Sequence, residues 1–223
     1  MRRHTAALLL SLAFAGCGSD DGAPPGPTGD DASLRVVNVS PGPVDVAVDG
    51  RIVQRGLFVN ALSERIGLAA GERAVELRLA AAPATRQAVT LEVREGRSYL
   101  VSATVAPSGS LGAEVDTGAT PIPGKSKLRI LHMARNAPPL DVWRTQPDFM
   151  TPTRIQFPFP YGSKSPFLEG DPGAWEVWVT PEGSGPGEKI ASSGPVVLEG
   201  GWVRTLILLD IQTNPGLEIV DDR

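Results

Sequence analysis

The segment "LRVVNVSPGPVDVAVDG", residues 34–50, contains the pattern from which the fold is predicted. Residues 44–48 alternate valine with aspartate or alanine, which is typical of a strand with one buried and one wet face. Asp49-Gly50 then supplies a two-residue hairpin turn, because both residue types adopt positive φ readily. The segment therefore predicts a short antiparallel hairpin.

The same pattern occurs twice along the chain. "LRVVNV" at 34–39 corresponds to "LRILHM" at 128–133, and "LAAGERAVEL" at 68–77 corresponds to "LEGDPGAWEV" at 168–177. A Glu-Gly pair before a later strand is a third match. Because the three matches keep their order, the sequence predicts two copies of one unit.

Short strand patterns, frequent glycine and proline, and the absence of a helical pattern of ten residues predict an all-β fold. We expect two tandem β-sandwich domains, at 34–117 and 128–223, joined by a linker at 118–127 where glycine and proline interrupt the pattern. Neither sandwich has cysteines to cross-link its sheets. Side-chain packing must therefore hold each one together.

The first sixteen residues are typical of a signal peptide, with two arginines, a short apolar core and small residues at the end. The apolar run is shorter than the roughly 20 residues of a membrane-spanning helix. "LAFAGC", residues 12–17, resembles the lipobox of bacterial lipoproteins, which implies cleavage before Cys17 and a lipid on its sulfur. The alternative is an ordinary secretory signal followed by a chance cysteine. A lone exposed thiol is a liability in an oxidising compartment, so lipidation is favoured.

The segment after Cys17 is rich in glycine, proline and aspartate and has no apolar period, which predicts a flexible tether over residues 17–33. The expected location is the bacterial cell envelope, with the lipid on Cys17 holding the protein on a membrane. Gly18, in place of an aspartate after the cysteine, favours the outer membrane in a diderm bacterium.

Composition excludes several function classes. The net charge of −4 becomes −6 once Arg2 and Arg3 are removed with the signal, and no basic patch suggests nucleic-acid binding. His132 is the single histidine after cleavage, so a Ser-His-Asp triad would need it, and no Gly-x-Ser-x-Gly motif accompanies it. His132 occupies the place of Asn38, where a polar side chain is expected to bond the turn backbone. No catalytic residue, metal site or cofactor is predicted, and the protein is not expected to be an enzyme.

Carboxylates recur at strand positions of both copies without predicting a site, and Asp49 belongs to the hairpin turn. Asp45 and Asp141 recur in both copies between apolar residues, so they are expected to face outward or to hydrogen-bond a loop. Glu76 and Glu176 are expected on wet strand faces. No dense Asp/Asn loop of the kind that binds calcium is present.

The quoted segment 34–50 and "LAAGERAVELRL" at 68–79 resemble a repeated bacterial surface domain, domain of unknown function 4397. The second copy keeps "NAPPLDVW" at 136–143 and "GDPGAWEVWVTPEGS" at 170–184 but lacks the Asp-Gly hairpin. The resemblance implies an immunoglobulin-like sandwich in an exported protein, often in tandem, without established catalytic residues.

Aromatic residues distinguish the two copies, because all four tryptophans fall in the second. Alternation places Trp143 and Trp178 on outward faces, where the first copy has Ala47 and Arg78. These rings could pack against the first copy or against residues 147–167, which is the preferred interpretation. They could instead dock a protein partner, since tryptophan is favoured at interface centres, or stack on the sugar rings of a polysaccharide.

The sequence therefore predicts a non-enzymatic, lipid-anchored cell-envelope protein that serves adhesion, scaffolding or envelope interaction. The alternative is a carbohydrate-binding module that uses Trp143 and Trp178. The expected partners are the membrane, through Cys17, and an envelope protein or a polysaccharide.

Overall fold

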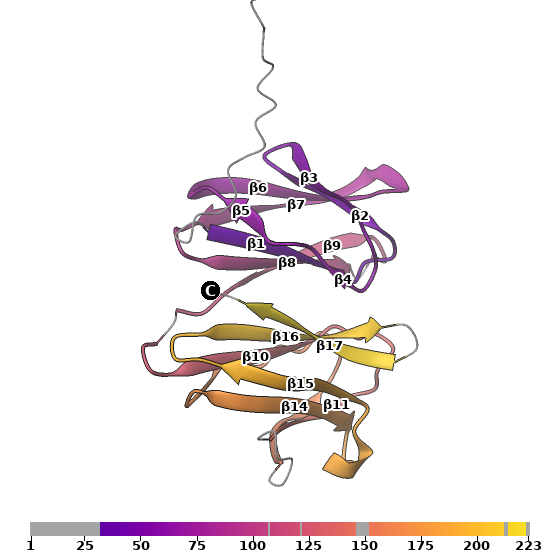
Figure 1. Ribbon diagram of the computed structural model, residues 1–223. Helices are drawn as coiled ribbons and strands as arrows, with labels where there is room; N and C mark the ends of the chain where they lie inside the picture. Colours follow the sequence, from indigo (N-terminus) through magenta and orange to yellow (C-terminus); the bar gives the residue numbers. More distant parts are fainter. Residues whose placement is uncertain (1–31, 107, 121, 146–151, 212–213, 222–223) are drawn as a thin grey trace, which may run out of the picture.

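The fold is all-β, as predicted, in a computed structural model of the chain (Figure 1). The described residues form seventeen strands, one 3₁₀ helix and four sheets, which Figure 1 shows stacked as four layers. The structure describes residues 32–106, 108–120, 122–145, 152–211 and 214–221.

The first two layers come from the first half of the chain. The first layer has the strand order β3-β2-β6-β7, and the second has the order β4-β1-β8-β9 with β5 also paired to β1. The strands are β1 Ala32–Asn38, β2 Val44–Val48, β3 Arg51–Leu57, β4 Ala61–Leu62, β5 Ile66–Leu68, β6 Gly71–Leu79, β7 Ala82–Val93, β8 Ser98–Val105 and β9 Leu111–Thr117.

The third and fourth layers repeat this arrangement with the second half of the chain. The third layer has the order β13-β10-β16-β17 and the fourth the order β12-β11-β14-β15. In both halves the first strand pairs in parallel with a late strand, β1 with β8 and β10 with β16. The elements are β10 Ser126–His132, β11 Leu140–Thr145, β12 Thr153–Phe159, β13 Leu168–Gly170, β14 Gly173–Pro181, η1 Pro186–Glu188, β15 Ala191–Leu198, β16 Val203–Ile211 and β17 Asn214–Asp221.

The hairpin predicted at Asp49-Gly50 is confirmed. These two residues connect β2 to β3 with φ angles of +49° and +80°, the left-handed conformation that such a two-residue turn requires. Val44 and Val46 of β2 point into the core, as the alternation predicts.

Three apolar clusters hold the four layers together. One fills the space between the first and second layers, and another the space between the third and fourth. The remaining cluster joins the second layer to the third, so the two sandwiches pack face to face. Its members are all 7% exposed or less: Val37, Val39, Leu100, Leu131, Met133, Ile207 and Leu209.

The central strands β1 and β16 bury side chains on both faces. Val36 of β1 lies in the core of the first sandwich, whereas its neighbour Val37 contacts the second sandwich. In β16, Leu206 and Ile207 divide in the same way. This explains why both strands carry consecutive apolar residues, a pattern typical of strands covered on two sides.

A buried ion pair completes the contact between the sandwiches. Arg129 of β10 is 6% exposed, and its Nη1 donates a hydrogen bond to Oδ1 of Asp116 in β9 at 3.3 Å. Its Nε donates to Oγ1 of Thr205 at 2.9 Å. Lys164 also donates to Asp116, at 2.9 Å. Burial alone would lower the pKa of the Lys164 ammonium, but the hydrogen bond and charge of Asp116 raise it above its ordinary value. Lys164 also pairs with Glu114 at 3.4 Å, so two carboxylates of the first sandwich balance two cations of the second.

The segment between β9 and β10 connects the two halves of the chain. The last strand of the first sandwich ends at Thr117, and the first strand of the second begins at Ser126, inside the expected linker 118–127. The signal peptide, Cys17 and most of the tether lie outside the described residues.

Replacing Asp116 by alanine is expected to lower the free energy of unfolding by about 3 kcal/mol, because Arg129 is left buried without its carboxylate. Urea unfolding followed by tryptophan fluorescence measures this loss. All four tryptophans lie in the second half of the chain, so the signal reports on the sandwich that does not contain the substitution.

Asp171→Ala is the matched control, because it removes the carboxylate from the exposed Lys125–Asp171 pair. Exposed pairs contribute little to stability, so its unfolding midpoint should stay near that of the parent chain. If Asp116→Ala also left the tryptophan transition unchanged, the two sandwiches would not be coupled through this ion pair.

Candidate functional site

Trp143 and Trp178 lie directly opposite each other on adjacent strands of the fourth layer. The antiparallel register of β11 and β14 pairs the two residues. Leu140 and Val142 of β11 point into the core, so Trp143 lies on the outer face, away from the first sandwich. The structure therefore brings together the two tryptophans that alternation predicted to face outward, and both are half-buried.

The polar residues beside the two indoles are buried. Glu176 is 3% exposed and Asp141 and Thr180 are fully buried. The Nε1 of Trp143 donates to Oγ1 of Thr180 at 2.9 Å, and that of Trp178 donates to Oε1 of Glu176 at 2.6 Å. The prediction that Glu176 lies on a wet face is therefore wrong, because the large rings of the same face lie over its carboxylate and exclude water.

The two buried carboxylates have different partners. Oδ2 of Asp141 accepts hydrogen bonds from the guanidinium of Arg154 at 3.1 Å and from the backbone of Gly183 at 3.2 Å. The expected bond from Asp141 to a loop is thus confirmed. Glu176 accepts from Trp178 and from the hydroxyl of Ser192. One oxygen of each carboxylate has no hydrogen-bond partner within the described part of the chain.

Cations lie over the aromatic rings of this face. The Cζ of Arg154 lies 4.1 Å from the ring centre of Phe157 and 5.7 Å from that of Trp143. The Nζ of Lys189 lies 4.5 Å from the ring centre of Trp178. These contacts define a row across β12, β11, β14 and the residue that follows η1, which we call the tryptophan strip: Phe157, Arg154, Trp143, Trp178 and Lys189.

Sequence analysis identified the tryptophans of the strip but missed its other members. Arg154 enters through the register of β12, which pairs it with Trp143. The alternation of Arg154, Ile155, Gln156 and Phe157 is a strand signal within the segment 147–167 that was considered only as a packing partner. Residues 146–151 lie outside the described part of the chain.

The strip combines flat aromatic rings with cations that lie over them. An indole ring has a large apolar face and donates one hydrogen bond at its rim. In this structure the two Nε1 groups are already bonded to Thr180 and Glu176, so the orientations of the rings are fixed before any ligand arrives. The arrangement suits a ligand that presents flat C–H faces together with polar groups around them.

His132 has the structural role predicted for it. Its ring is fully buried and stacks on Phe159 with a centroid distance of 5.9 Å, and Nε2 lies 3.4 Å from the carbonyl oxygen of Pro138. The equivalent Asn38 also bonds turn backbone, accepting from Ser40 N at 2.9 Å. Among the residues described, no carboxylate or hydroxyl hydrogen-bonds to His132, so no triad is formed there.

Two further searches apply to the described ranges. Within them, no His, Cys, Asp or Glu side chains gather in a group of three or more that could hold a metal ion. No helix in the same ranges has the length and apolar character needed to cross a membrane.

Comparisons with known proteins give one family and several remote structural similarities. Residues 32–143, half of the chain, match the family model described as Domain of unknown function (DUF4397). No curated protein matches the sequence. One similar solved structure shows alpha-glucan recognition by family 41 carbohydrate-binding modules from streptococcal virulence factors. It is 13% identical, covers 83% of this chain and 96% of that chain, and has a TM-score of 0.26.

A second similar solved structure is a product complex of the multi-modular glycogen-degrading pneumococcal virulence factor SpuA. It is 10% identical over 80% of this chain, with a TM-score of 0.25. The matched region spans 21% of that longer protein.

Stability is expected to depend on His132 in mildly acidic solution. Burial lowers the pKa of its imidazole, and the Pro138 carbonyl and Asp210 offset this only in part. As the pH falls below about 6.5, His132 of the unfolded chain binds a proton before His132 of the folded chain does. The free energy of unfolding should therefore fall between that pH and the lower pKa of the folded chain.

Urea unfolding of the parent chain and of His132→Asn at about pH 7.5 and about pH 5.5 measures this loss. Asparagine is the residue at the equivalent position 38 and does not titrate. The parent should lose more stability than the variant over this interval. Equal losses would show that His132 is not the group responsible.

Proposed function

The chain belongs to the DUF4397 family, and we propose that it is a non-catalytic, lipid-anchored cell-envelope protein whose second sandwich binds a polysaccharide through the tryptophan strip. The observation that carries the proposal is the pairing of Trp143 with Trp178 on an outward face. Neighbouring indoles fixed side by side offer stacking surfaces for successive sugar rings, whose C–H faces are apolar.

The composition of the strip supports a glycan better than a protein partner. Phe157 and Val197, at 60% and 52% exposure, are strongly exposed large apolar residues of this face, and only Phe157 belongs to the strip. Protein interfaces are built around a broad, well-packed core that excludes water. Here Arg154 and Lys189 lie over the half-buried rings, and their N–H groups can donate hydrogen bonds to sugar hydroxyls.

We also propose that the second sandwich is a divergent copy of the first and that both are immunoglobulin-like. The two halves share their strand topology. Ser63 and Ser165 support the equivalence, because their hydroxyls accept from the backbone N–H of Val36 and Ile130 in corresponding strands. Tyr99 bonds backbone upstream of its own strand, a hallmark of immunoglobulin-like sandwiches.

Glycan binding is tested with the chain from residue 17 onward, carrying Cys17→Ser so that it stays soluble, on an array of bacterial and plant polysaccharides. Saturable binding should weaken at least about tenfold in Trp143→Ala and in Trp178→Arg, because each change removes a stacking surface. Phe157→Ala should weaken binding too, and the exposure of Phe157 makes a loss of folding there unexpected.

The matched control is Trp202→Ala, which removes a tryptophan outside the strip and should leave the affinity unchanged. Unfolding midpoints are recorded for every variant. If the strip variants unfold at lower urea but bind glycans like the parent, the rings serve packing alone. If the chain captures an envelope protein specifically and binds no glycan, the strip binds a protein partner and the polysaccharide proposal is wrong.

The anchor is tested separately by comparing the parent chain with Cys17→Ser in the native envelope. The proposal rests on the "LAFAGC" motif at residues 12–17. Cys17→Ser should release the folded protein into the soluble fraction, because stable anchoring depends on the acyl chains. Continued association of that variant with washed membranes at high salt would contradict lipidation.

A further inference from the structure

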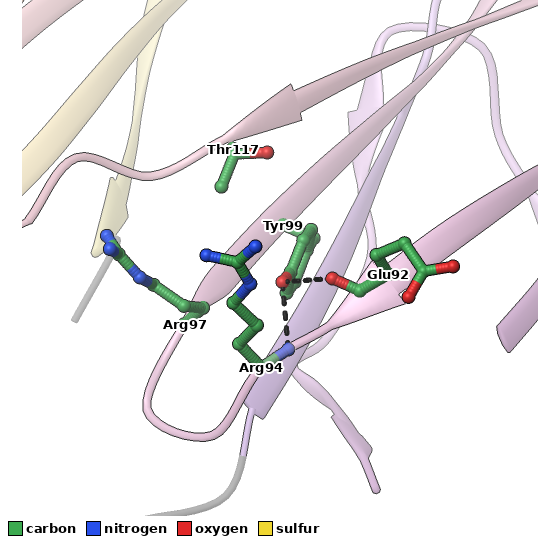
Figure 2. Close-up of a pocket in the computed structure, with 5 residues that line it drawn as sticks. All are labelled: Glu92, Arg94, Arg97, Tyr99 and Thr117. Atoms are coloured by element: carbon green, nitrogen blue, oxygen red, sulfur yellow. Dashed lines mark hydrogen bonds between the residues drawn. The ribbon is translucent and has the colours of Figure 1, made fainter. Parts of the chain in front are cut away.

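A small pocket lies at the turn between β7 and β8 in the first sandwich, on surface that the tryptophan strip does not include (Figure 2). Its volume is about 290 Å³, and it is lined by Glu92, Arg94, Arg97, Tyr99 and Thr117. This is near the lower end of the range for small-molecule sites, about 300–1,000 Å³. The pocket therefore has room for a small polar group rather than for a long glycan.

The turn that forms the pocket sets two arginines side by side. The backbone N–H of Arg97 donates to the carbonyl of Arg94 at 3.2 Å, and Gly96 adopts a φ of +65° between them. The hydroxyl of Tyr99 donates to the carbonyl of Glu92 at 2.9 Å and accepts from the N–H of Arg94 at 3.0 Å. Both ends of the turn are thus held in place by backbone bonds.

Arg94 and Arg97 line the pocket with their side chains. Figure 2 shows them on the same side of the turn as Thr117, while the carboxylate of Glu92 points away. Neither Arg94 nor Arg97 forms an ion pair with any carboxylate in the described ranges, although other arginines of the same sandwich do. Two cationic side chains that line one pocket attract an anion into it.

We propose that this pocket binds a phosphate group. The planar fork of arginine matches phosphate oxygens and donates two parallel hydrogen bonds to them. Arg94 and Arg97 supply the free donors of the pocket lining, whereas the Tyr99 hydroxyl is already used. A phosphate offers enough acceptor oxygens for two guanidinium groups.

The phosphate can come from a lipid headgroup or from a soluble phosphate ester. The pocket adjoins the start of β1, because Ser33 N donates to the carbonyl of Arg97 at 2.9 Å. Residues 18–31 span at most roughly 50 Å when fully extended. With the lipid on Cys17 that we propose above, the headgroups of the anchoring membrane are within reach.

The soluble chain carrying Cys17→Ser is titrated with glycerol 3-phosphate by calorimetry, and Arg94→Gln/Arg97→Gln should bind at least about tenfold more weakly. Arg51→Gln/Arg55→Gln is the control. It removes the same charge from two exposed arginines of the same sandwich and should bind like the parent.

Flotation with vesicles of phosphatidylcholine alone or mixed equally with phosphatidylglycerol distinguishes the sources. Binding to the mixed vesicles that the double variant loses identifies a lipid headgroup, and binding of glycerol 3-phosphate alone identifies a soluble ester. The proposal is overturned if the parent binds neither, or if the control pair loses as much affinity as the Arg94/Arg97 pair. Glycan binding by Arg94→Gln/Arg97→Gln should be unchanged. The test of the phosphate pocket is therefore independent of the test of the tryptophan strip.

Discussion

The face-to-face contact between the second and third layers is the constraint on which the rest of the structure depends. The central strands β1 and β16 each present apolar side chains on two sides, so neither sandwich alone can cover its own apolar surface. The contact also fixes the polar groups at its edge, because Asp116 must meet Arg129. Once the inner faces are joined, only the first and fourth layers keep a free outer face, and the tryptophan strip lies on one of them.

Much of the fold follows from local sequence, whereas the contact between the sandwiches does not. The Asp49-Gly50 turn is a local pattern that depends on few residues. The adjacent Val36 and Val37, and the apolar run at 206–209, do indicate strands covered on both sides. These residues do not specify what covers the second face of the strand. A sheet of the same domain, the other domain or another molecule could do so, because the covering residues lie far away in the chain.

Part of the candidate site could also be predicted from local sequence, and part of it could not. Strand alternation was sufficient to place Trp143 and Trp178 outward, because it depends only on neighbours along one strand. The burial of Glu176 and the position of Arg154 depend on the register between strands and on how large rings lie across them. A carboxylate that alternation assigns to a wet face becomes buried when its neighbours on that face are indoles. Alternation along a strand predicts which face of the sheet a residue is on. Side chains on the neighbouring strands determine whether that residue is covered.

The parallel pairing of β1 with β8 has a mechanical consequence. The six residue pairs from Ser33↔Ser98 to Asn38↔Ala103 lie side by side along the two strands, and their hydrogen bonds run across the strand direction. The chain leaves the first sandwich at Thr117, which pairs with Tyr99 and so lies at the same end of the sheet as the start of β1. A pull between these two points therefore opens the strand pairs one after another, and bonds opened in turn resist less force than bonds loaded together. Resistance to such a pull then depends on the face-to-face contact of the two sandwiches.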